Sequence, residues 1–263
     1  TIIEEPARTL ALGSVWQDVF QEKPFDKLPA SNFLTELGNF GEFSPNIHAP
    51  DYFNFYNSLQ HRPNSLPGPD CISFAGWKAA GDLGIACMQK VDGLLREGQL
   101  PPDGDDYNDS IVAFLVKGEK ADDAVAVNRD AMEMRPLSMK NCFNKVIMAA
   151  NCNALNSEYS EITHETQNGF TGGRNFIKNI VANDSAGRMY SCAYEGSKKP
   201  FLVPSTIPIS AAFDFLAAFP SVIHDWIWAV LTHRKLPYHF INFFKANYHG
   251  AKAVFTHNVP HTI

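Results

Sequence analysis

Ala212-Phe213-Asp214-Phe215-Leu216-Ala217-Ala218-Phe219-Pro220-Ser221 is the stretch that decides how this chain is interpreted. An apolar run with the residue types of a buried strand precedes it and ends on the carboxylate of Asp214. Carboxylates are rarely buried without a partner, and a metal ion is a common partner. Proline is favoured at the first position of a helix, so Pro220 predicts a helix over about 220–234. The alternative is that Asp214 only caps that helix.

The composition describes a folded protein of one large or two modest domains. The chain has 263 residues, of which 45% are hydrophobic and 12% are aromatic. This argues for a real core and against disorder. Five widely spaced cysteines without a CxxC pair favour reduced thiols over a disulfide framework or a zinc site. We expect an intracellular protein, nuclear or cytoplasmic, that is neither secreted nor bound to a membrane.

The charge distribution is uneven along the chain. The net charge of −6 argues against a simple nucleic-acid binder. From Glu195 to the end, however, six basic and three acidic residues give +3, so the preceding part carries −9. Much of that acid lies in two predicted solvated loops, at 103–106 and 119–123. The second loop contains Ala121-Asp122-Asp123.

Hydrophobic periodicity and turn residues predict the secondary structure. Ser138 is expected to cap a helix that reaches about Leu155. A glycine-rich turn over 167–174 is expected to precede a helix from about Asn175. The other predicted elements are a helix over 74–96, a buried strand over 110–116, a helix over 237–248 and a strand over 251–255.

Five segments, in order, resemble the reverse transcriptase domain of non-LTR (LINE-like) retrotransposons. The entry motif is Pro-Gly-Pro-Asp, in which Cys71 replaces the family's following glycine. A fingers strand reads Phe-Leu-Val-Lys-Gly, in which Val116 replaces a proline. The remaining three segments are Arg135 to Asn141, Gln167 to Arg174 and Phe213 to Ser221. The resemblance covers about residues 60–263.

The resemblance implies an α+β fold that is part of a right-hand polymerase. It divides the chain into an N-terminal extension (1–60), a fingers region (61–205) and the beginning of the palm, with its first strand and following helices (206–263). The family's catalytic Asp-Asp hairpin lies farther downstream. We therefore expect a fragment of a longer reading frame that is inactive alone.

The resemblance also implies roles for particular residues. Asp214 and the Phe215 carbonyl would bind Mg²⁺, with two ions in the full-length parent. Lys117 and Arg135 would contact the triphosphate of a dNTP. Phe219 would lie beside the ribose and favour dNTPs over rNTPs.

The turn over 167–174 would approach the nucleic acid through Gly169, Phe170, Gly173 and Arg174. Simpler alternatives exist for each site. They are a solvated hairpin lysine for Lys117, a surface salt bridge for Arg135, a core aromatic for Phe219 and an ordinary helix-entry loop for 167–174.

The implied function is RNA-directed DNA synthesis, with an RNA template, a DNA primer and dNTPs as partners. Two alternatives stay open. One is a degenerate, non-catalytic remnant of such an enzyme. The other is a maturase-like RNA-binding protein with the same fold but without polymerisation.

Overall fold

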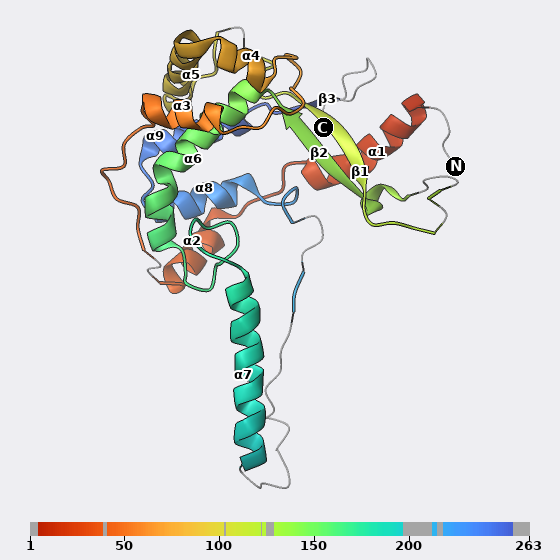
Figure 1. The fold of residues 1–263 in the computed structure, drawn as a ribbon, viewed down its shortest axis with the longest axis vertical. Helices are drawn as coiled ribbons and strands as arrows, with labels where there is room; N and C mark the ends of the chain where they lie inside the picture. Colours follow the sequence, from red (N-terminus) through yellow and green to blue (C-terminus); the bar gives the residue numbers. More distant parts are fainter. Residues whose placement is uncertain are drawn as a thin grey trace.

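A computed structural model describes residues 5–38, 41–102, 104–121, 123–124, 129–196, 212–214 and 218–254. Within these residues the chain is mostly helical, with one antiparallel hairpin (Figure 1). The helices are α1 (Glu5–Phe20), α2 (Lys27–Glu36), α3 (Tyr52–Gln60), α4 (Phe74–Ala79), α5 (Gly81–Arg96), α6 (Cys142–Ile162), α7 (Ile177–Gly196), α8 (His224–His233) and α9 (Tyr238–Tyr248). The strands are β1 (Ser110–Val116), β2 (Met134–Lys140) and β3 (Ala253–Val254), and a 3-10 turn (Ala131–Glu133) precedes β2. This is an α+β composition, while the polymerase fold stays a prediction.

The main core lies between α3, α5, α6 and α9. Its fully buried side chains recur at helical spacing on each of these helices, as expected for amphipathic helices that pack together. They include Phe55, Leu59, Met88, Leu95, Val146, Ile147 and Phe243. Because α3 belongs to the segment before residue 61, that segment contributes to the same core. The predicted limits of the N-terminal extension, fingers and palm stay a prediction.

A buried ion pair joins the helices of this core. The Arg96 guanidinium lies 2.7 Å from the Asp92 carboxylate, and the two side chains are 9% and 6% exposed. Asn151 of α6 donates to the second carboxylate oxygen at 2.6 Å and accepts from Arg96. The guanidinium also lies 4.5 Å from the centre of the Phe240 ring in α9. One polar cluster therefore ties α5, α6 and α9 together.

The sheet has the order β2-β1-β3, with β1 antiparallel to β2 and parallel to β3. The predicted strand over 110–116 is confirmed. The helix expected to reach about Leu155 is confirmed as α6, but its start is wrong. Ser138 lies in β2, where it pairs with Val112 of β1, and α6 begins only at Cys142. Helix α1 covers one face of the hairpin, with the Trp16 ring 6.2 Å from the Phe114 ring.

Other predictions are confirmed in part. The helix over 74–96 is interrupted at Gly81, which has a φ of 56°. Helix α9 and strand β3 lie where they were expected. The helix expected from Pro220 is wrong in its start, since 218–221 form turns and α8 begins at His224.

The strand expected before Asp214 is not formed by the part that the structure describes. Residues 201–211 lie outside the described ranges, and Ala212 to Asp214 belong to no strand. Helix α7 projects away from the rest of the molecule in Figure 1. The side chains over 177–192 are all exposed along it. Among the described helices, none is long and apolar enough to cross a bilayer. All five cysteines are free thiols.

Candidate functional site

The β1–β2 hairpin places the two predicted triphosphate-binding cations on one face. Leu115 pairs with Arg135, and the Lys117 N–H continues the ladder by donating to the Glu133 carbonyl at 2.9 Å. Paired residues of an antiparallel ladder share a face, as do residues two apart on one strand. Lys117 and Arg135 therefore lie on the same face, which is opposite to the face that Phe114 shares with α1.

The two cations differ in their surroundings. Arg135 is exposed. The Lys117 amine is half-buried and donates to the Met132 carbonyl at 2.8 Å. That contact directs Lys117 back towards the loop of its own hairpin, which is what the hairpin-lysine alternative describes. A role for either residue in binding a triphosphate stays a prediction.

Two ion pairs join described residues of the loop of this hairpin. Lys120 lies 2.9 Å from Glu133, and Arg129 lies 2.6 Å from Asp123. The hydrogen bond from the Arg129 guanidinium is the main cause that lowers the pKa of Asp123 to about 2. Asp123 is thus an ion-paired loop residue. Asp122, its neighbour in Ala-Asp-Asp, lies outside the described residues.

The Pro-Gly-Pro-Asp segment forms a tight turn against the start of α6. The Cys71 N–H donates to the Gly68 carbonyl at 3.0 Å, and the Asp70 N–H donates to the Asn141 side chain at 3.0 Å. A Cβ on Gly68 would lie 2.4 Å from the Asn141 nitrogen, so only glycine fits there. Cys71 has a φ of 58°, a conformation that glycine adopts more easily than cysteine. The turn is therefore formed despite the replacement of the family's glycine.

The glycine-rich turn over 167–174 is held by Arg174. Its two terminal nitrogens donate to four carbonyls, those of His164 (2.6 Å), Gln167 (3.2 Å), Ser160 (2.8 Å) and Thr163 (2.9 Å). These carbonyls belong to the last turn of α6 and to the loop that follows it. The geometry favours the helix-entry-loop alternative for Arg174. A contact between this side chain and a template phosphate stays a prediction.

The other predicted residues of this turn have different surroundings. Gly173 has a φ of 73°, and Phe170 has a φ of 58° with 95% of its surface exposed. Around Gly169, a Cβ would find only an ordinary contact with Gln167. The centres of the Phe170 and Phe219 rings lie 6.5 Å apart, with the ring planes at 89° to each other. The structure thus brings together two predicted site residues that are far apart in the sequence.

The stretch around Asp214 is only partly described. Asp214 is exposed, and Phe215 lies outside the described residues, so the predicted metal-binding carbonyl has no described position. Phe219 is 83% exposed, which argues against the core-aromatic alternative. The segment 212–214 and the loop end of the β1–β2 hairpin lie apart in Figure 1. No group of three or more His, Cys, Asp or Glu in the described part of the chain could hold a metal ion.

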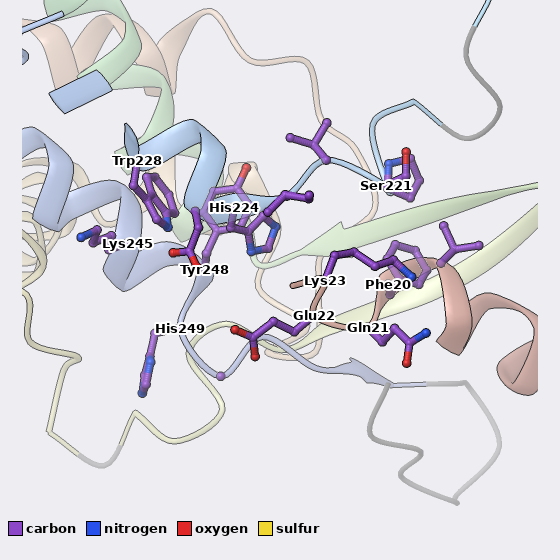
Figure 2. Close-up of a pocket in the computed structure, with 16 residues that line it drawn as sticks. Phe20, Gln21, Glu22, Lys23, Ser221, His224, Trp228, Lys245, Tyr248 and His249 are labelled. Atoms are coloured by element: carbon purple, nitrogen blue, oxygen red, sulfur yellow. The ribbon is translucent and has the colours of Figure 1, made fainter. Parts of the chain in front are cut away.

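A pocket of about 460 Å³ opens directly after this stretch, between the end of α1, the start of α8 and the end of α9 (Figure 2). Three aromatic side chains cluster in its wall. The Tyr248 ring lies 4.6 Å from the His224 ring and 5.7 Å from the Trp228 ring. Two acids and two lysines also line it, namely Glu22, Asp225, Lys23 and Lys245. The pocket therefore combines two acids and two lysines with a cluster of aromatic rings.

Sequence reasoning did not single out this aromatic cluster as a site. His224 and Trp228 are four residues apart, and such residues lie on one face of a helix. That spacing was a usable signal. Tyr248 comes from another helix, so only the tertiary structure brings its ring to the other two. Comparison with protein-family models and with curated proteins finds no match for this chain.

Proposed function

We propose that this chain is the fingers and first palm part of an RNA-directed DNA polymerase of the non-LTR retrotransposon type. The observation that carries the proposal is the β1–β2 hairpin, which holds two of the five motif segments. Its register puts Lys117 and Arg135 on one face, as a shared triphosphate site requires. The contact between Phe170 and Phe219 also supports it, because it joins two further motif segments.

Catalysis by the proposed enzyme depends on metal ions. Bound Mg²⁺ would activate the primer hydroxyl and stabilise the leaving pyrophosphate. Asp214 offers the hard oxygen donor that Mg²⁺ prefers. The described residues supply no carboxylate cluster around it. In the resemblance the other catalytic carboxylates belong to a separate Asp-Asp hairpin, so we expect residues 1–263 alone to extend no primer.

Primer extension by the complete parent protein tests this proposal. The assay uses an RNA template, a DNA primer, dNTPs and Mg²⁺. Asp214→Asn should abolish extension, because the amide removes the negative charge that holds the ion. Glu97→Gln is the control, since Glu97 is an exposed acid at the end of α5. It should extend the primer as the unchanged protein does.

Two results would contradict the proposal. One is extension by the Asp214→Asn variant at the rate of the unchanged protein. The other is an unchanged parent that binds the template and primer without extending them. The second result would favour the RNA-binding alternative.

A further inference from the structure

A second cavity, of about 520 Å³, has a lining with a marked charge bias. It lies between one face of α6, the end of α9, the end of β2 and the segment after α3. No carboxylate lines it. Three cations do, namely Arg62, Lys140 and Lys145. The whole chain carries a net charge of −6, so this concentration of positive charge does not follow from composition. Its volume is in the range of ligand sites.

The two lysines of this cavity make contacts with the fold, but no carboxylate in the cavity lining pairs with them. The Lys140 amine donates to the Asn247 carbonyl at 3.1 Å, which accounts for one of its three donors. The Lys145 amine lies 5.9 Å from the centre of the Phe74 ring. Burial lowers the pKa of Lys140, because desolvation penalises the charged form. An anion in the cavity would offset that penalty.

The wall of the cavity is fixed by hydrogen bonds that point away from it into the fold. Asn144 donates to the Tyr107 carbonyl at 2.7 Å, and Asn153 donates to the Ser58 hydroxyl at 3.0 Å. Lys145 lies beside Asn144 on the same helix. The cavity is therefore preformed, and a ligand has few groups to order when it binds.

Aromatic surface adjoins the basic cavity. Tyr248 lines this cavity and also the pocket of Figure 2, where its ring meets those of His224 and Trp228. The outer residues of the cavity, Arg62 and Cys152, are exposed, so its mouth is open. Proteins bind single strands by combining a basic groove along the phosphates with aromatic rings on which bases stack.

We propose that the basic cavity binds phosphate groups of a single-stranded nucleic acid, with a base stacked on Tyr248. The inference deepens the proposed function and rests on it for the identity of the strand. Arg62 would grip phosphate oxygens at the mouth through its planar fork of donors. Lys140 and Lys145 would act as point charges inside. The strand would continue past Tyr248 into the pocket of Figure 2.

Cys152 provides a direct readout, because this residue lines the cavity. Cys142 is 0% exposed, so replacing the other three cysteines with serine leaves Cys152 as the reactive thiol. The experiment measures the rate of maleimide labelling of the full chain. The probes are a 12-nucleotide oligo(U), UMP and inorganic phosphate. We expect oligo(U) to slow labelling in proportion to the fraction bound, at concentrations where UMP and phosphate do not.

Charge and ring variants test which residues carry the binding. Arg62→Gln should lower the affinity for oligo(U) and reduce the slope of log affinity against log salt by about 0.7. Tyr248→Leu should lower the affinity roughly 5- to 150-fold by removing a stacked base. Lys90→Gln is the control, because Lys90 is an exposed cation of α5 that does not line the cavity. It should leave both quantities unchanged.

The labelling experiment has further outcomes that support or overturn the proposed binding site. The proposal is overturned if oligo(U) gives no protection. It is also overturned if UMP or phosphate protects as well as oligo(U), which would mark a small-anion site. Asp214→Asn should leave the protection intact, since that residue does not line the cavity. Protection together with a parent that extends no primer would refute polymerisation and leave this binding site standing.

Discussion

Replacing Asp92 with alanine should destabilise the fold more than replacing a charged residue that is exposed to solvent. The substitution leaves the Arg96 guanidinium buried beside Asn151 without its counter-charge. The carboxylate accepts from Arg96 at 2.7 Å and from Asn151 at 2.6 Å. Both partners are buried, so water cannot replace the lost oxygen atoms.

The size of the effect follows from those two hydrogen bonds. Each hydrogen bond to a charged group contributes about 1.5–3 kcal/mol, so their loss removes about 3–6 kcal/mol. Breaking a buried ion pair by removing one partner costs about 3–5 kcal/mol. We expect Asp92→Ala to lower the free energy of unfolding by about 4 kcal/mol. Arg96→Met combined with Asp92→Ala should be less destabilised than Asp92→Ala alone, because no charge is then left buried.

Urea unfolding followed by far-ultraviolet circular dichroism measures these changes. With a slope of about 2–3 kcal/mol per molar urea, Asp92→Ala should move the midpoint down by about 1.3–2 M. Helix α7 provides a matched control. Its Arg188–Asp184 pair has the same 2.7 Å separation and the same spacing, but its side chains are 78% and 58% exposed. Asp184→Ala should cost less than about 0.5 kcal/mol.

The reasoning would be refuted if Asp92→Ala and Asp184→Ala had similar effects. Equal effects would mean that burial does not amplify the Asp92 interaction. A double variant as unstable as the sum of the two single variants would also refute it, because the charges would then be independent.

Four further predictions follow from the site. Cys71→Gly should raise the free energy of unfolding by up to about 1 kcal/mol in urea unfolding, by relieving the positive φ. The Arg129 contact holds the Asp123 pKa at about 2, so its contribution to the hairpin loop is present above the ordinary value near pH 4 and lost as pH falls towards 2. Amide exchange of the loop across that range measures this. In the proposed polymerase, Arg135→Ala should lower the efficiency of dNTP use by about 10- to 150-fold in steady-state kinetics. Phe219→Ala there should raise the ratio of rNTP to dNTP efficiency, and an unchanged ratio would remove this residue from sugar selection.

The sequence predicts elements whose signal is local. The helix over 237–248 and the strand over 110–116 have clear periodicity or a compact apolar run, and both are confirmed. The helix over 74–96 also has the right extent, although Gly81 interrupts it. In these cases the pattern of one segment determines its structure.

Prediction fails where a distant partner decides the structure. Ser138 is a good helix cap by residue type, yet strand pairing with Val112 holds it in β2. Helix α6 begins four residues later, at Cys142, and the Asn141 side chain before it accepts from the Asp70 N–H. Both outcomes depend on partners that are 26 or more residues away in the sequence, which a local pattern does not contain.

In the candidate site, too, the sequence predicts the residues, while distant contacts determine their surroundings. Residue types and motif order predict Lys117, Arg135 and Arg174 as site cations, and the hairpin register places the first two on one face. What each cation can bind depends on its remaining donors. The two terminal nitrogens of Arg174 are directed at four carbonyls, and the Lys117 amine is directed at one.

The basic cavity, in contrast, is identified by the structure and not by a sequence motif. Arg62, Lys140 and Lys145 come from the segment after α3, from β2 and from α6, and no single motif contains all three. Their positive charge matters because the fold gathers them where no carboxylate lines the wall, next to the Tyr248 ring. A motif search ranks residues by type and order, whereas binding an anion depends on the charges that surround one volume. Of the three cations only Lys140 lies in a motif segment, so binding at this cavity tests nucleic-acid binding largely independently of the motif residues.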